Sequence, residues 1–114
     1  MNKKIKNVKK ERYVNLYKAI LTLETVDECM KFFDDLCSVT ELKAMEQRYQ
    51  VAELLSQGHI YNSILDQTGA SSATISRVNR SLQYGADGYA IAFERLGITS
   101  GQKSGNEDGS GEQK

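Results

Sequence analysis

The stretch from residue 60 to residue 82, IYNSILDQTGASSATISRVNRSL, constrains the fold of this chain more than any other. It predicts two short helices separated by a tight turn. The first helix runs to Thr68, and Gly69 follows it, where glycine can adopt the left-handed conformation that ends a helix. Ser71 or Ser72 then serves as the N-cap, since a serine hydroxyl accepts hydrogen bonds from the free N–H groups of a new helix.

The second of these helices, residues 72–82, sorts its side chains by face. Ile75, Val78 and Leu82 recur at helical spacing and form an apolar stripe. The opposite face is small, hydroxyl-bearing and basic, and the segment 67–86 holds no Asp or Glu. Its side chains are those of Ala73, Ser76, Arg77 and Arg80, with Thr74 on one flank. Such a face suits a helix that enters the major groove of DNA, where hydroxyls contact phosphates or bases and arginine can bind guanine with two hydrogen bonds.

Two interpretations of this helix pair are open on spacing alone. One is a helix-turn-helix whose second helix recognises DNA. The other is an ordinary helical hairpin in an all-α protein, because short motifs also match by chance. The basic, acid-free face favours the first.

The run GASSATISRVNRSLQYGADGY resembles the DNA-reading half of the Trp repressor superfamily, in particular its YerC/YecD-type branch. The specific part is Gly-Ala-x-x-Ala-Thr-Ile-Ser/Thr-Arg, from Gly69 to Arg77. The likeness continues upstream through AMEQRYQVAELL to the helices around FFDDLC and covers about residues 13–96. It implies an all-α protein of about six helices that binds double-stranded DNA as an intertwined two-fold dimer.

Charge and composition suggest three regions. Residues 1–18 hold seven basic and one acidic residue, whereas residues 19–96 hold six basic and eleven acidic ones. Residues 1–12 are expected to form a flexible basic arm, which either adds salt-dependent affinity along phosphates or is simply a solvated tail. Residues 13–96 then form the helical DNA-binding domain. The remaining 97–114 are rich in Gly, Ser and acidic residues and are expected to be disordered.

A cytoplasmic location is expected. No apolar run approaches the ~20 residues of a membrane span, so no membrane partner is predicted. The lysine-rich N-terminus also lacks the apolar core of a signal peptide.

Caps and apolar spacing predict further helices on both sides of the pair. A helix over residues 11–23 is followed by a capping box at Thr25 and Glu28, which opens a helix to about Cys37. Thr40 is expected to cap a long third helix.

Glycines are expected to end the long third helix and the last one. The third helix stops at Gly58. Asp87 is expected to cap the last helix, which ends at Gly97. The inward face of that last helix is expected to consist of Tyr89, Ala92, Phe93 and Leu96.

The helices at residues 26–37 and 42–55 are apolar around more than one face. A domain of this size buries little of its surface alone, so the second face is expected to be covered by another copy of the chain. A two-fold dimer would place two recognition helices roughly 34 Å apart, about one DNA turn, and would read an inverted repeat. The alternative is a monomeric bundle whose extra apolar residues pack internally.

Candidate DNA-binding residues follow from helix position and from the resemblance. Arg77 lies mid-helix, in the arginine position of the family, and Arg80 is expected to meet phosphate. Asn62 corresponds to a backbone-contact position where family members often carry arginine. The expected DNA-binding residues are Ser72, Ala73, Thr74, Ser76, Arg77, Arg80 and Asn62, with Gly69 required by the turn.

The resemblance also bears on a co-repressor. In Trp repressor, tryptophan packs beside a glycine that follows the recognition-helix arginine, and against an arginine of the preceding long helix. This chain has Val78 and Gln47 at those positions. Tryptophan is therefore not expected to be a co-repressor, which leaves constitutive DNA binding or another signal.

Catalysis and metal binding are not expected, so no catalytic residue, metal ligand or cofactor is assigned. His59 is the one histidine, and no nucleophile–base constellation accompanies it. Cys29 and Cys37, eight positions apart, would lie about 12 Å apart on one helix, too far for a disulfide. They are expected to pack as small apolar side chains.

The sequence thus predicts a transcriptional regulator that represses by occluding an inverted-repeat operator. Two alternatives stay open: an accessory helix-turn-helix protein of a mobile element, and a protein-interaction module without sequence-specific regulation of its own. A peptide-binding groove would not need the basic, acid-free face, which favours DNA.

Overall fold

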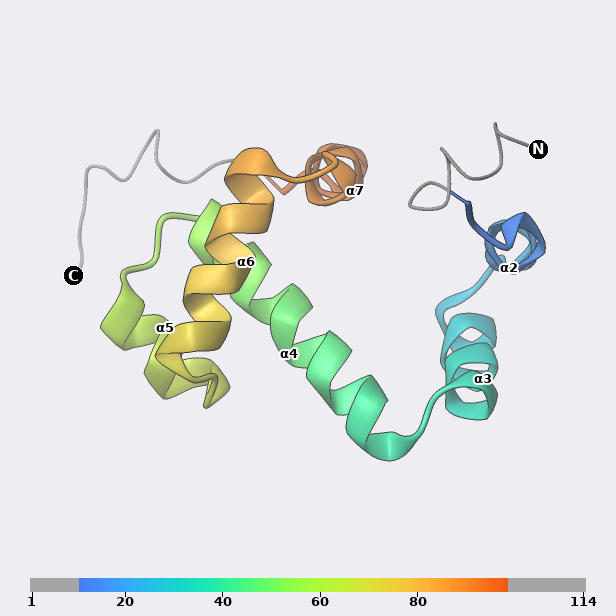
Figure 1. Cartoon of the computed structure of the whole chain (residues 1–114), viewed down its shortest axis with the longest axis horizontal. Coiled ribbons are helices and arrows are strands. Elements are labelled where there is room, and N and C mark those ends of the chain that lie inside the picture. Colours follow the sequence, from blue (N-terminus) through green and yellow to red (C-terminus); the bar gives the residue numbers. More distant parts are fainter. Residues whose placement is uncertain (1–10, 99–114) are drawn as a thin grey trace. The chain divides into compact units, whose positions relative to one another are not determined.

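The computed structural model describes residues 11–98, which form six helices and no strand (Figure 1). The helices are α2 (Val14–Leu21), α3 (Val26–Leu36), α4 (Val39–Ser56), α5 (Tyr61–Thr68), α6 (Ser72–Tyr84) and α7 (Gly88–Leu96). The expected arm and tail fall almost entirely in residues 1–10 and 99–114, outside the described residues. The chain divides into two compact units, Met1–Val39 and Thr40–Lys114.

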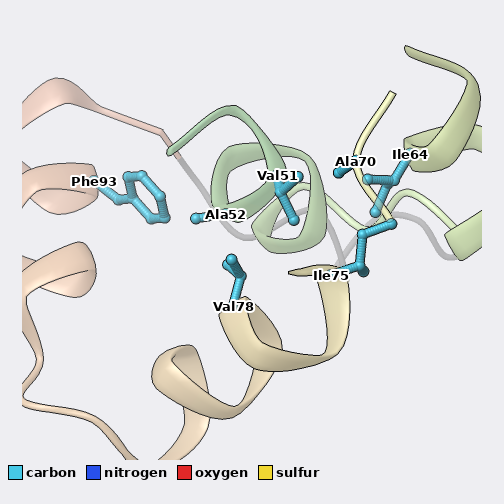
Figure 2. Packing of buried hydrophobic residues seen from close by; sticks show 7 residues of the cluster. All are labelled: Val51, Ala52, Ile64, Ala70, Ile75, Val78 and Phe93. Atoms are coloured by element: carbon cyan, nitrogen blue, oxygen red, sulfur yellow. The ribbon is translucent and has the colours of Figure 1, made fainter. Parts of the chain in front are cut away.

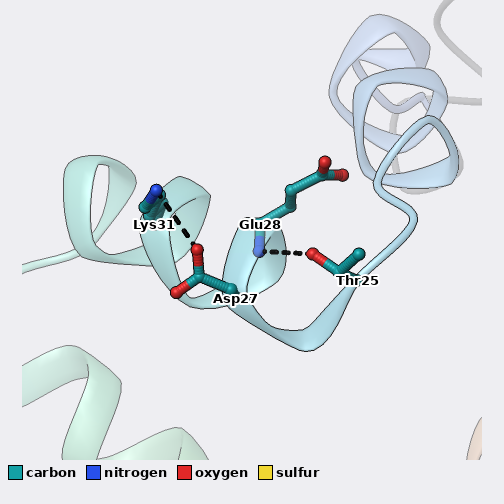
Figure 3. A network of polar contacts seen from close by, with 4 residues as sticks. All are labelled: Thr25, Asp27, Glu28 and Lys31. Carbon is teal, nitrogen blue, oxygen red and sulfur yellow. Dashed lines mark hydrogen bonds and ion pairs between the residues drawn. The ribbon is translucent and has the colours of Figure 1, made fainter.

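In the first unit, the capping box before α3 is confirmed, with one difference (Figure 3). The Thr25 hydroxyl accepts a hydrogen bond from the Glu28 N–H at 3.0 Å. The Glu28 carboxylate reaches back to the N–H of Glu24, at 2.8 Å, one residue before the cap. A nearby ion pair between Lys31 and Asp27, at 3.1 Å, is solvent-exposed and contributes little to stability.

Within the described chain, neither α2 nor α3 contains a buried residue. Many of their apolar side chains are uncovered: Leu21 is 85% exposed and Met30 is 60% exposed. The other exposed large apolar side chains of this unit are Tyr13, Val14, Tyr17, Val26, Leu36 and Val39. Cys29 and Cys37 are half-buried free thiols.

The helix α4, which lies almost wholly in the second unit, begins at Val39, so the predicted Thr40 cap is wrong and Thr40 lies inside the first turn. Threonine suits a cap by residue type, but residue type alone does not fix the position at which a helix begins. The predicted end is confirmed: Gly58 has φ +89°. The N–H groups of Gly58 and His59 donate to the carbonyls of Leu55 and Leu54, which α4 itself leaves unpaired.

The core of the second unit lies among α4, α5, α6 and α7 (Figure 2). It consists of Val51, Ala52, Ile64, Ala70, Ile75, Val78 and Phe93. Tyr49 packs edge-on against Phe93, with ring centroids 5.7 Å apart. Burial, followed by the hydrogen bond and negative charge of Glu53, raises the pKa of the Tyr49 hydroxyl above its ordinary value.

The last helix lies between Asp87 and Gly97 as predicted, but Asp87 and Leu96 differ from expectation. Asp87 occupies the N-cap position, but it adopts a left-handed φ of +70° and makes no capping hydrogen bond. A capping side chain normally requires extended backbone at that residue, which explains the missing bond. Leu96 is 64% exposed rather than inward. The chain reverses at Gly97, whose φ is +78°, and Ile98 packs against the core beyond it.

None of the helices among residues 11–98 has the length and apolar character needed to cross a membrane.

Candidate nucleic-acid interface

The turn between α5 and α6 is held by local hydrogen bonds. Gly69 has φ +71°, and its N–H donates to the Leu65 carbonyl at 2.9 Å. An added Cβ at Gly69 would meet nothing within 4 Å, so the need for glycine is conformational rather than steric. The Thr68 hydroxyl donates to the Ile64 carbonyl at 2.7 Å and accepts from the Ala70 N–H at 3.0 Å. The predicted turn residue is thus confirmed in its backbone role.

Ser71, rather than Ser72, is the N-cap of α6. Its hydroxyl accepts from the Thr74 N–H at 3.1 Å. The helix then continues to Tyr84, two residues beyond the predicted end. Its first turn holds no acidic residue, so the positive end of the helix dipole is not neutralised by a nearby carboxylate of that turn.

The faces of α6 are arranged as the sequence predicted. Ile75 and Val78 are buried in the core, and Leu82 is half-buried against it. The opposite face is consequently turned outward. Exposed there are Ser72, Ala73, Ser76, Arg77 and Arg80, whereas Thr74 is half-buried.

On one flank, α6 and α4 enclose a hollow of about 200 Å³. The hollow is lined by Ala44, Gln47, Arg48, Ala73, Thr74 and Arg77. It brings Arg77 together with Arg48, which is absent from the sequence-based candidates. Two guanidinium groups beside a threonine hydroxyl make this edge suited to a phosphate or carboxylate. A search for exposed basic residues on α4, the helix before the helix-turn-helix, would have found Arg48.

On the other flank, α5 approaches α6 through two hydroxyl groups. The Tyr61 hydroxyl lies 3.5 Å from the Ser76 hydroxyl, and either can donate. Tyr61 is 40% exposed. Asn62 is also exposed in the first turn of α5, but within residues 11–98 no hydrogen bond joins it to α6. The candidates of α6 are thus exposed or half-buried on one helix, and Asn62 lies on the neighbouring helix α5.

Among residues 11–98, no group of three or more His, Cys, Asp or Glu side chains is placed to hold a metal ion.

A sequence model of the Trp repressor protein family matches residues 11–97. The chain belongs to the Trp repressor family. The Trp repressors are DNA-binding regulators rather than enzymes, which supports the predicted helix-turn-helix and the regulatory role at the level of the family.

Relatives of this Trp repressor family member agree with the assignment. The uncharacterized protein YerC of Bacillus subtilis (strain 168) is 46% identical over 89 residues, which cover 78% of this chain and 86% of YerC. A crystal structure from Staphylococcus aureus, described as a candidate Trp repressor, has 47% identity and a TM-score of 0.76 over 82% of this chain and 96% of that one. A TrpR-like protein from Eubacterium eligens ATCC 27750 has 50% identity and a TM-score of 0.71 over 75% of this chain and 88% of its own. The likeness confirms the all-α, Trp repressor-like fold.

Proposed function

We propose that this Trp repressor family member is a sequence-specific transcriptional regulator that represses by occupying an inverted-repeat operator. The observation that carries the proposal is the outward face of α6. That face is basic and hydroxyl-bearing, and the burial of Ile75 and Val78 holds it away from the core. A helix with such a face, preceded by a tight turn and a shorter helix, is the arrangement that enters the major groove.

Each candidate has a proposed role. Ser72 and Ala73, in the first turn of α6, approach the base edges closely. Arg77 contacts a base, since an arginine fork matches guanine. Arg80, one turn further, binds phosphate. Thr74 and Ser76 contact phosphates or bases with their hydroxyls, and Asn62 contacts the backbone from α5.

The proposed active form is a homodimer. The large apolar side chains that α2 and α3 leave exposed support it, because exposed apolar surface often marks a protein interface. A two-fold dimer would duplicate α6 and so read two half-sites. Tryptophan is not proposed as a co-repressor, since the side-chain amide of Gln47 is already bonded to the Thr68 carbonyl. Val78 is the other residue on which the expectation about tryptophan rested. It lies in the core and does not line the hollow between α4 and α6.

Changing Leu21 to Glu should weaken the dimer. The side chain is exposed in one chain, so the fold of α2 should survive, whereas a dimer would lose two buried leucines. At about 1.5–3 kcal/mol for each leucine, the dimer dissociation constant should rise about 100-fold or more. Analytical ultracentrifugation measures it, with Asn15→Glu on the polar side of α2 as the matched control. Equal dissociation constants for Leu21→Glu, Asn15→Glu and the parent chain would contradict this interface.

The function is tested by selecting bound duplexes from a random pool with purified, dialysed protein. Recovery of an inverted repeat, with a relaxed preference at one position of each half-site for Arg77→Ala, would establish a dimeric, sequence-specific regulator. No enriched sequence at moderate salt would contradict sequence-specific binding. Dimer formation without enrichment would favour the protein-interaction module instead.

A further inference from the structure

A hydrogen bond from Gln47 ties the turn of the helix-turn-helix to α4. The Nε2 of Gln47 donates to the backbone oxygen of Thr68 at 3.1 Å, although the two residues are 21 positions apart. Thr68 is the last residue of α5, and its carbonyl has no partner further along the helix because the chain turns at Gly69. The glutamine amide therefore satisfies an acceptor that α5 leaves open.

The same glutamine lies next to the recognition helix. Gln47 lines the hollow together with Thr74 and Arg77 of α6. One turn further along α4, Val51 and its neighbour Ala52 make apolar contacts in the core. Apolar contacts are non-directional, whereas a hydrogen bond has a preferred length and angle. Gln47 thus joins α4 to the end of α5 by a directional contact, one helical turn away from the apolar contacts of Val51.

We propose that Gln47 is a positioning residue for DNA recognition, which holds the turn and the start of α6 in the DNA-reading orientation without a bound small molecule. Only Gly69, Ala70 and Ser71 separate Thr68 from α6, so a displaced Thr68 carbonyl shifts the start of the recognition helix. Recognition side chains must be held within about 0.5 Å to make their contacts. The inference deepens the proposed function and rests on it.

The test compares Gln47→Met with Gln50→Met. Methionine has nearly the length of glutamine but cannot donate, and Gln50 is an exposed residue of the same helix. The ratio of the Kd for a scrambled duplex to the Kd for the selected operator is measured for each, with dialysed protein well below its Tm. Gln47→Met should lower this ratio about tenfold, mainly through the operator Kd. Amide hydrogen exchange of residues 69–74 should also become faster in Gln47→Met and stay unchanged in Gln50→Met.

The outcomes separate this inference from the function on which it rests. An operator preference in the parent chain that survives in Gln47→Met would overturn the positioning role alone. A loss of affinity for operator and scrambled duplex alike would also overturn it, since that is what partial unfolding produces. A parent chain that prefers no duplex after dialysis would overturn the proposed function and this inference together.

Discussion

Replacing Ile75 by alanine is expected to lower the free energy of unfolding by about 2–5 kcal/mol, the usual cost of truncating a buried isoleucine. Ile75 is 0% exposed and lies in the core with Ile64 and Val51. Its loss leaves a cavity between α6 and the two helices that support it. Urea unfolding followed by circular dichroism measures the change, at one protein concentration because a dimer makes stability concentration-dependent.

Ser81→Ala is the matched control for Ile75→Ala. Ser81 is exposed on the same helix, so its truncation should alter the unfolding free energy by less than about 0.5 kcal/mol. A similarly small effect for Ile75→Ala would show that α6 is not held by this face. The outward assignment of the opposite face would then be wrong as well.

Replacing Arg77 by alanine is expected to cost about 1–3 kcal/mol in each half-site, so the operator Kd of the proposed dimer should rise about 30-fold or more. Arg77 is exposed on α6 and lines the same hollow as Arg48 of α4. A base contact predicts a relaxed preference at one position of each half-site. Fluorescence anisotropy with the selected operator and its single-base variants measures this.

Arg95→Ala removes the same charge from an exposed position in the last turn of α7 and serves as the control. It should leave operator affinity within about twofold, since long-range surface charge is screened by salt. If Arg77→Ala instead weakened all duplexes equally and reduced the salt slope by about one for each half-site, Arg77 would bind phosphate rather than a base. Unchanged binding of every duplex would remove Arg77 from the interface.

Short-range signals account for the features that were predicted correctly. Gly69 ends α5 because its backbone is left-handed, a conformation that costs little only for a residue without a side chain. This preference is a property of the residue itself. The buried face of α6 follows from the recurrence of Ile75 and Val78 at helical spacing. The wrong cap at Thr40 and the missing cap at Asp87 show the limit: residue type identifies a capable side chain, whereas backbone conformation decides whether it caps.

Long-range features escaped prediction because they join separate segments. Arg48 joins Arg77 in the hollow only because α4 and α6 lie side by side there. The bond from Gln47 to Thr68 spans two helices. Leu96 has the spacing of an inward residue, yet it is exposed and Ile98 packs against the core beyond the turn.

The sequence by itself therefore determined the helices, the turn at Gly69 and the sorting of α6 into an apolar and a basic face. Each depends on residues within about one or two helical turns, where propensity, capping and spacing act. Tertiary structure alone decided which flank of α6 meets α4, that Gln47 reaches the turn, and that apolar side chains such as Leu21 stay uncovered in a single chain. These three features depend on how the helices pack against one another. Packing brings together side chains that are far apart in the sequence, and their separation along the chain does not predict the contact.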